Sequence, residues 1–294
     1  MSRGEVLSGK TLEACTLGIV GLGLMGGALA MALRRCGAGA RGGLLACDTD
    51  GETLGAALDR KLIDRGFSVP GEMLPRCDLV FLCLNPSTLL RFLDDWMGAF
   101  KGGALLTDIA GTKGNIVEAV ERDLRGDLDF IPGHPMAGAE GGGFANAEKC
   151  DFLGKNYILT PLERNRPENL EFLEDLIHRM GFGRITRTTA AEHDRNIAFT
   201  SQLCHVIAAA LIDCEEDRGI TRFGGGSFED LTRIAMLNAP MWTELFIENR
   251  DCLLERIRRF EGSLDALKGV IAAGAAEELR ERLTIVRERR AAMV

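Results

Sequence analysis

The side chain best placed for chemistry in this sequence is a histidine between a short apolar run and a glycine-rich segment. His134 is one of four histidines among the 294 residues, and the proline that follows it restricts the backbone. A neutral imidazole, with an ordinary pKa of about 6.5, can accept a hydroxyl proton while a hydride leaves the same carbon. We therefore predict that His134 is the general base of an alcohol oxidation. Taken alone, the segment is equally compatible with a loop histidine that makes a structural hydrogen bond.

A glycine pattern near the N-terminus predicts where the hydride acceptor binds. The sequence G-L-G-L-M-G follows an apolar run and opens a helical stretch. Glycines in this context allow a tight turn, a close approach of the backbone to a pyrophosphate, and packing of the helix on the strand, with the helix N-terminus facing the anion. The predicted cofactor-binding residues of this turn are Gly21, Gly23, Leu24, Met25 and Gly26.

An aspartate at the end of the second apolar run predicts which dinucleotide binds. Asp48 lies 22 residues after Gly26. A carboxylate at this point accepts hydrogen bonds from the adenosine ribose and repels a 2′-phosphate, which favours NAD over NADP. Asp50 is close enough to share this role.

The nine cysteines form no C-x-x-C pair, so no metal is expected.

The elements that must position these residues alternate between strand-like and helix-like stretches. This rhythm predicts an α/β fold, a Rossmann-type doubly wound and mostly parallel sheet over residues 1–188, with a substrate site beyond the carboxyl ends of the strands. Segments 107–114 and 132–140 follow expected strands and are therefore the regions where catalytic groups should lie. The expected strands are 16–22, 44–48, 79–84, 104–109, 130–132, 157–160 and 184–188, with helices at 24–35 and 115–124.

The sequence changes character after residue 190, where no strand pattern remains and three long helical stretches follow. We predict an all-helical substrate-binding and dimerisation domain over residues 189–294. Its last stretch has apolar side chains spaced as on the seam of a long helix. A homodimer interface would use such a seam, and packing within one chain would explain it equally well. The seam residues are Leu253, Ile257, Phe260, Leu264, Leu267 and Ile271.

Composition and charge limit the partners of the chain. A formal net charge of −8 and a pI near 5.2 oppose binding to nucleic acid or to an anionic membrane. No apolar segment approaches the roughly 20 residues of a membrane helix, and residues 1–10 do not have the pattern of a signal peptide. We therefore expect a cytoplasmic enzyme with a small-molecule substrate.

Several motifs resemble the prephenate and arogenate dehydrogenase family, and the resemblance extends over nearly the whole chain. The H-P-M-A-G and T-R-I-A segments are the specific ones, because neither is a general feature of dinucleotide-binding folds. The motifs are the glycine turn, Thr107-Asp108 with the glycine and lysine that follow, His134 to Gly138 with Glu140, Ser201 to His205, Leu231 to Ala235, and Met241-Trp242.

The resemblance implies a reaction and roles for individual residues. The reaction is NAD-dependent oxidative decarboxylation of prephenate to 4-hydroxyphenylpyruvate in tyrosine biosynthesis. His134 would contact the ring hydroxyl, Arg233 would bind a substrate carboxylate, and His205 would face the substrate side chain. Glu140 and Asp230 would border the entrance as a gate. Without the resemblance, Arg233 is equally compatible with an ion pair to Asp230, and a core histidine is the more natural interpretation of His205.

Some positions depart from the family pattern. Many relatives have a serine near Gly111 that joins the histidine at the ring hydroxyl, and Thr112 is the nearest hydroxyl here, although water could serve instead. Gln202 and Cys204 stand where relatives often have histidine and proline. Glu229 replaces a residue that is often basic, and an acidic group there would tolerate the amino group of arogenate.

Three alternatives remain open from the sequence. The first is an arogenate dehydrogenase, which gives tyrosine directly. The second is a hydroxyacid dehydrogenase that joins a similar glycine turn to a helical domain and uses a lysine, for which Lys113 is the candidate. The third is a dinucleotide-binding regulator without activity, supported only by the missing serine.

Overall fold

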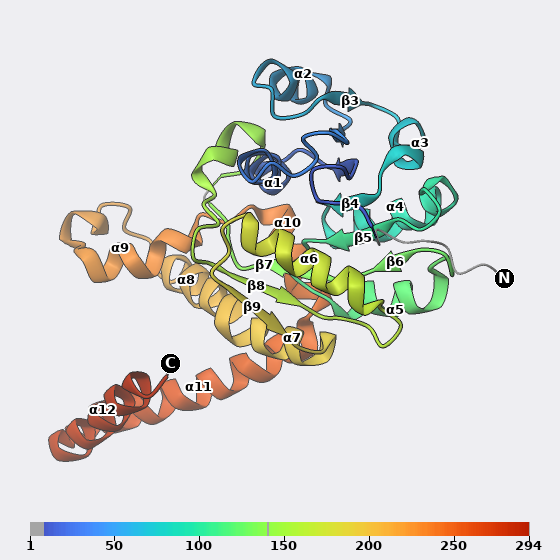
Figure 1. The fold of residues 1–294 in the computed structure, drawn as a ribbon. Helices are drawn as coiled ribbons and strands as arrows, with labels where there is room; N and C mark the ends of the chain where they lie inside the picture. The colour runs from blue at the N-terminus through green and yellow to red at the C-terminus, as the bar shows by residue number, and fades with distance from the viewer. Residues whose placement is uncertain (1–8, 140, 294) are drawn as a thin grey trace.

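The computed structural model describes residues 9–139 and 141–293, and a six-stranded parallel sheet forms its centre (Figure 1). The strand order is β3-β2-β1-β4-β5-β6, and each neighbouring pair is parallel. This is the doubly wound order in which the topology reverses between β1 and β4, so the prediction of an α/β fold is confirmed. The strands are β1 (Leu17–Val20), β2 (Leu44–Cys47), β3 (Arg65–Phe67), β4 (Leu79–Leu82), β5 (Leu105–Asp108) and β6 (Asp129–Phe130).

Both faces of the central sheet are buried, as expected for parallel strands covered by crossover helices. Leu17 and Ile19 of β1 belong to the apolar cluster on one face, and Val20 belongs to the cluster on the other. Helices α1 and α6 contribute to the first cluster, and α4 and α5 to the second. The helices of this part are α1 (Leu24–Arg35), α2 (Gly51–Asp59), α3 (Pro70–Met73), α4 (Pro86–Trp96), α5 (Gly114–Asp123) and α6 (Pro167–Arg179).

A second, three-stranded sheet carries His134 and corrects the sequence-based expectation. It consists of β7 (Gly133–Pro135), β8 (Asn156–Leu159) and β9 (Arg184–Arg187), with β7 antiparallel and β9 parallel to β8. His134 is the middle residue of β7 and pairs with Ile158, so it does not lie in a loop after a strand. Glycine and proline normally indicate a turn, so the sequence did not predict strand β7. In the structure β7 is an edge strand, where proline is tolerated.

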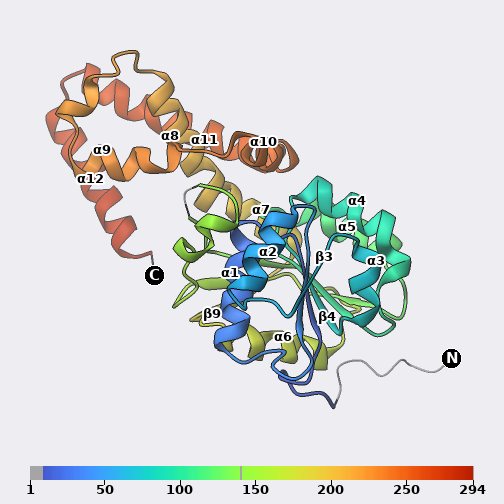
Figure 2. The same cartoon turned by 90° about the horizontal axis from the view of Figure 1, so that it is seen from above.

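The remainder of the chain is helical, and no strand follows Arg187 within the described residues. Helix α7 (Ala190–Ile197), a π-helical turn (Ala198–Gln202) and α8 (Leu203–Asp213) form one continuous helix. Figure 2 shows that α8, α9, α11 and α12 form an arm that projects from the sheet-containing body. The other helices are α9 (Gly226–Thr232), α10 (Ala239–Glu248), α11 (Arg250–Ala272) and α12 (Ala276–Ala291).

The continuous helix corrects the expectation about membrane-length segments. By length and composition alone, residues 190–213 could cross a membrane, with a mean hydropathy of 1.3 in the relevant window. Core helices of soluble proteins pass the same test when they are mostly buried, but only 28% of this window is buried in a single chain. The helix therefore presents apolar surface that one chain does not cover.

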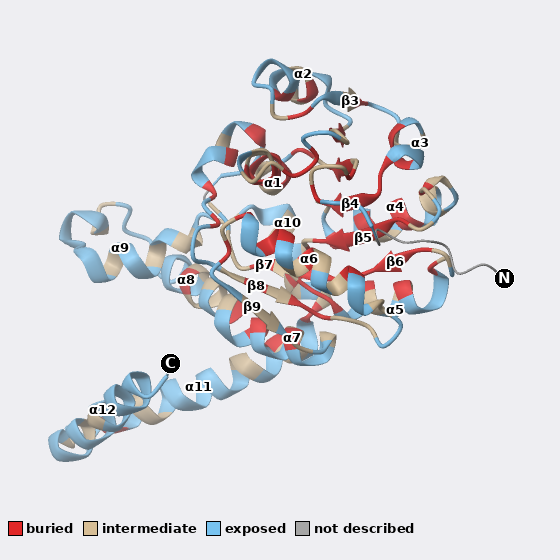
Figure 3. Cartoon of the chain, viewed as in Figure 1, coloured by how far each residue is buried: buried red, intermediate tan, exposed pale blue. Residues whose placement is uncertain are grey.

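The apolar seam of α11 is mostly uncovered in one chain (Figure 3). Leu253, near the start of the helix, is 5% exposed, whereas Leu264 and Ile271 are 53% and 63% exposed. Helix α12 follows and contributes no buried residue. Ile257 and Leu267 are half-buried, so packing within one chain covers the seam only in part.

Candidate active site

The glycine turn after β1 has the shape that a dinucleotide diphosphate requires. Gly21 has φ +88°, and a Cβ on it would lie 2.6 Å from the Cys83 carbonyl oxygen. A Cβ on Gly26 would lie 1.9 Å from the Gly21 carbonyl oxygen. In contrast, a Cβ on Gly23 would meet nothing within 4 Å, and this residue starts α1 without a side-chain cap or an acidic first turn. The space beside Gly23 at the N-terminus of α1 is thus open, and a helix N-terminus favours an anion.

The two aspartates after β2 have different partners. Asp48 accepts a hydrogen bond from the Leu22 backbone N–H at 2.6 Å, which places its carboxylate against the glycine turn. Asp50 caps α2, where it accepts from Glu52 N–H and from the Thr53 hydroxyl. Asp48 also accepts from the Asp50 backbone N–H, so both carboxylates have protein partners, and it is the contact with Leu22 that places Asp48 nearer the glycine turn.

His134 is half-buried and its Nδ1 lies 2.9 Å from Nε2 of His193 in α7. The pKa of His134 is lowered well below its usual value of 6.5, first by burial and then by the nearby His193 and Lys113. A histidine with a lowered pKa is neutral at physiological pH, which is the form that accepts a proton. The environment of His134 thus favours the neutral imidazole.

A buried ion pair lies behind His134. The side chains of Lys113 and Asp108 are both 0% exposed and are joined by a salt bridge. Asp108 also accepts hydrogen bonds from the backbone N–H groups of Ala110 and of Gly133, the residue before His134. The Lys113–Asp108 pair therefore holds the backbone at Gly133, immediately before His134.

Contacts connect this pair to the glycine turn. Cys83, which follows β4, packs against Gly21 and Gly26, and burial, together with the charge of Asp108, raises the pKa of its thiol. Asp108 in turn holds Gly133. The expected cofactor site and His134 therefore lie at the same carboxyl-end edge of the sheet.

A second group of expected site residues gathers on the helical side. The rings of His205 and Trp242 are 3.7 Å apart between centroids, and His205 Nδ1 is 2.9 Å from the Ser201 carbonyl oxygen. The pKa of His205 is lowered by burial and by the charge of Arg233, and the turn that carries Arg233 packs against α8. Because α7 and α8 are continuous, one helix carries both His193 and His205.

The position of the missing serine is occupied by an apolar contact. A Cβ on Gly111 would lie 3.2 Å from a Leu245 methyl group of α10. The buried Thr112 hydroxyl donates to Glu248 Oε2 at 2.7 Å, and burial raises the pKa of Glu248. Thr112 thus joins the sheet side to α10, and its expected catalytic role stays a prediction to which this contact lends no support.

The proposed gate is described only in part. Glu140 lies outside the described residues. Asp230 and Glu229 are exposed on α9, about one helical turn before Arg233. Gln202, one of the departures from the family pattern, is buried and bridges the Leu245 carbonyl oxygen and the Asn249 side chain.

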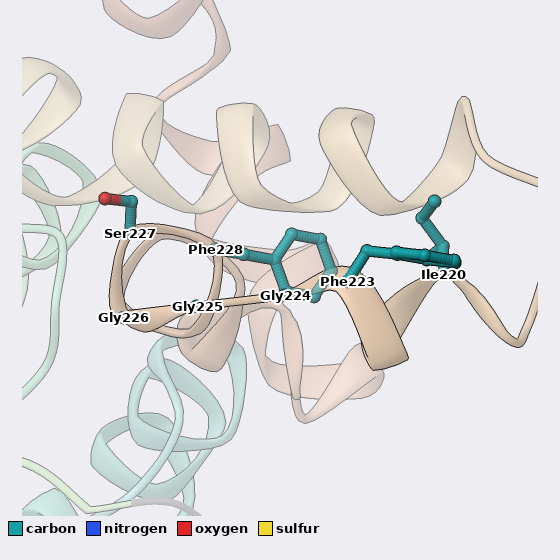
Figure 4. Close-up of a pocket in the computed structure, with 7 residues that line it drawn as sticks. All are labelled: Ile220, Phe223, Gly224, Gly225, Gly226, Ser227 and Phe228. Atoms are coloured by element: carbon teal, nitrogen blue, oxygen red, sulfur yellow. The ribbon is translucent and has the colours of Figure 1, made fainter.

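A shallow hollow lies away from these groups, between the start of α9 and the segment before it (Figure 4). Its lining contains no titratable side chain, so it does not provide a reaction site. Phe223, one of its aromatic side chains, is 81% exposed. The lining residues are Ile220, Phe223, Gly224, Gly225, Gly226, Ser227 and Phe228.

Sequence reasoning missed His193 and Asp194. Both lie in a polar stretch at the start of a helix, which reads as an ordinary exposed first turn, yet His193 is 1% exposed. The available signal was the adjacent histidine and aspartate in a chain with four histidines.

Within the described residues, no cluster of histidine, cysteine or acidic side chains is arranged to hold a metal ion.

Two family models match consecutive parts of the chain. The model for "Prephenate dehydrogenase, nucleotide-binding domain" matches residues 29–186, and that for "Prephenate dehydrogenase, dimerization domain" matches residues 189–285. The chain belongs to the prephenate dehydrogenase family. The relation implied by the sequence motifs is thereby confirmed.

Individual relatives in the prephenate dehydrogenase family agree with this assignment. Prephenate dehydrogenase of Bacillus subtilis is 28% identical over 270 residues, which cover 90% of this chain and 72% of that protein. The crystal structure of the A. aeolicus prephenate dehydrogenase with hydroxyphenyl propionate and NAD+ has a TM-score of 0.85 and 30% identity, covering 97% of this chain and 100% of that one. Synechocystis arogenate dehydrogenase has a TM-score of 0.78 at 30% identity, covering 95% and 100%.

Proposed function

We propose that this chain oxidises prephenate with NAD and releases carbon dioxide, giving 4-hydroxyphenylpyruvate in tyrosine biosynthesis. The observation that carries the proposal is a neutral, half-buried His134 at the same sheet edge as the open glycine turn. The family assignment supplies the substrate class, and the relative solved with NAD+ and a hydroxyphenyl compound supports both ligands. We place the functional division of the chain near residue 188, between the matches of the two family models.

The proposed mechanism assigns one task to each group of residues. Bound NAD supplies the hydride acceptor. His134 takes the proton of the ring hydroxyl at Nε2 as the hydride leaves the carbon that bears the oxygen. The ring carboxylate departs as carbon dioxide, and its bonding electrons make the ring aromatic, which makes the step effectively irreversible. The proton then returns from His134 to the ring oxygen, giving the phenol of the product. Arg233 and His205 bind the side chain of the substrate, for which a guanidinium offers a two-point contact with a carboxylate.

Two alternatives are less well supported. Lys113 is fully buried on Asp108, where no substrate reaches it, which argues against a hydroxyacid dehydrogenase that uses this lysine. Arogenate is favoured only by the acidic Glu229. The arogenate dehydrogenase of Synechocystis is as similar in sequence as the A. aeolicus prephenate dehydrogenase, but the latter has the higher TM-score.

The test is to follow NADH or NADPH formation by ultraviolet absorbance with each substrate and each cofactor. We expect kcat/KM with prephenate and NAD to exceed that with arogenate by at least about tenfold, a ratio that a few well-placed contacts can supply. Turnover with NADP should be weak, because Asp48 repels a 2′-phosphate. A strong preference for arogenate would reassign the substrate, and no turnover of either compound would refute the proposal.

The lowered pKa of His134 predicts the pH dependence of the reaction. The neutral imidazole is the active form, so kcat/KM should remain constant as the pH falls through 6.5 and decline only below it. The measurement is a pH profile of kcat/KM at saturating NAD. An acidic limb centred at or above pH 6.5 would contradict the environment described for this ring.

We further propose a cytoplasmic homodimer formed through the helical region. The dimerization-domain match, the uncovered seam of α11 and the exposed Phe223 support this assembly. Apolar surface of this extent is characteristic of an interface between subunits. A sedimentation mass of a single chain at micromolar concentration would contradict it.

A further inference from the structure

A chain of hydrogen bonds continues from His134 into the helical region. His134 Nδ1 lies 2.9 Å from His193 Nε2, and His193 Nδ1 lies 2.7 Å from Asp194 Oδ1. His193 is 1% exposed, so both of its ring nitrogens depend on these protein partners. The two histidine rings meet edge to face, at 62° between planes.

The chemistry of the partners fixes where the protons reside. An ionised carboxylate only accepts hydrogen bonds, so the proton of His193 is on Nδ1, facing Asp194. Its Nε2 then carries a lone pair, which accepts from Nδ1–H of His134. The remaining nitrogen of His134, Nε2, is left with a free lone pair. This is the tautomer that a general base needs.

Asp194 is itself held in place by the loop after β5. Its Oδ1 accepts from the Lys113 backbone N–H at 2.9 Å, and its Oδ2 accepts from the Gly114 N–H at 2.8 Å. These N–H groups begin α5, where an acceptor is favourable. The carboxylate is therefore oriented independently of His193 and can act as a fixed reference for that ring.

His193 is also the one side chain whose hydrogen bond to His134 is observed within the described residues. Gly111 has no side chain, and the Thr112 hydroxyl donates its hydrogen bond to Glu248. The side-chain hydrogen bond of His134 is therefore the one that joins its Nδ1 to His193 Nε2.

We propose that His193 and Asp194 are positioning residues of the reaction, which hold His134 as the Nδ1–H tautomer and receive part of its positive charge. When the substrate O–H bond breaks and an N–H bond forms at His134 Nε2, the imidazolium retains its Nδ1–H bond to His193. That proton can move to His193 Nε2, which places the charge next to the Asp194 carboxylate. The expected effect on kcat rests on the proposed function, whereas the expected tautomer of His134 does not.

The structural consequence is tested by nitrogen-15 NMR of the full-length protein labelled in its four histidines. We expect His134 to show a protonated Nδ1 and an unprotonated Nε2. In His193→Leu this pattern should shift toward the Nε2–H form, because no acceptor remains for Nδ1–H. His178→Gln is the matched control, since this exposed histidine of α6 has only a long contact to the Phe182 carbonyl oxygen.

The kinetic consequence is a fall in kcat without a comparable change in KM. His193→Leu should lose about 10²-fold in kcat, within the range for a group that sets the tautomer of a catalytic histidine, while KM for prephenate stays within about threefold. His193→Gln, whose amide oxygen can still accept from Nδ1–H, should recover about tenfold of this loss and keep the His134 tautomer. This variant preserves polarity and size, so it decides the question even if the leucine variant does not fold.

Three outcomes would overturn the inference. The first is an unchanged His134 tautomer in His193→Leu. The second is a kcat of His193→Leu within threefold of that of the unmodified enzyme. The third is equal activity of His193→Leu and His193→Gln. If the unmodified protein does not oxidise prephenate or arogenate, the proposed function fails, but the tautomer measurement on the free protein still confirms or refutes the positioning role.

Discussion

Replacing His134 with asparagine is expected to lower kcat for prephenate by about 10³-fold, within the range that general-base catalysis contributes. Asparagine retains a hydrogen-bonding group at the ring hydroxyl but cannot accept its proton. KM for prephenate and the affinity for NAD should change by less than about threefold, because we assign binding to Arg233, His205 and the glycine turn. Steady-state kinetics with prephenate and NAD provide the measurement.

The control for this variant is His178→Asn, which makes the same substitution at an exposed position of α6 and should leave kcat unchanged. A further requirement is that His134→Asn keeps the Tm of the unmodified protein, which separates lost chemistry from lost folding. If kcat of the folded variant stays within tenfold, the proton is accepted elsewhere and the assignment of the base is wrong.

The second large effect is on stability. Replacing Lys113 with methionine leaves Asp108 buried without its cation, and breaking one side of a buried pair costs about 3–5 kcal/mol in free energy of unfolding. For a protein of this size the expected fall in Tm is on the order of 10 °C. Calorimetry or circular dichroism during heating measures it. Combining the change with Asp108→Asn should restore part of the loss, because the uncompensated charge is removed.

Lys101→Met is the matched control, because Lys101 pairs with Asp78 while remaining 39% exposed. Lys10 also binds Asp78, so the expected loss is below about 1 kcal/mol. A Lys113→Met protein that melts normally but has no activity would instead indicate a lysine used in chemistry. That result would revive the hydroxyacid dehydrogenase alternative.

The central sheet was predictable because its physics is local. Apolar runs such as Leu79–Leu82 are buried on both faces, and the glycine turn has its own steric signature at Gly21 and Gly26. β3 and β7 were missed for a common reason. Each has three residues and includes a glycine, so its strand conformation depends on pairing with a neighbour that the local sequence does not reveal.

Single residues of the candidate site could be proposed from their own type and local sequence. Contacts between residues that are distant in sequence could not. His134 and Asp48 are recognisable from their position after or within strands. The role of His193 depends on α7 packing beside β7, and the fate of the Thr112 hydroxyl depends on α10. Both contacts join segments more than 50 residues apart in sequence, at separations of 59 and 136 residues.

The junction between α10 and α11 has a mechanical consequence. Asn249 alone separates these helices, is 5% exposed, and donates from its side chain to the Asp194 carbonyl oxygen and to Gln202. The bend between α10 and α11, where the projecting arm begins, is therefore hydrogen-bonded to Asp194, the residue that we propose orients His193. A movement of the arm would therefore reach Asp194, the hydrogen-bond partner of His193, through the side chain of Asn249.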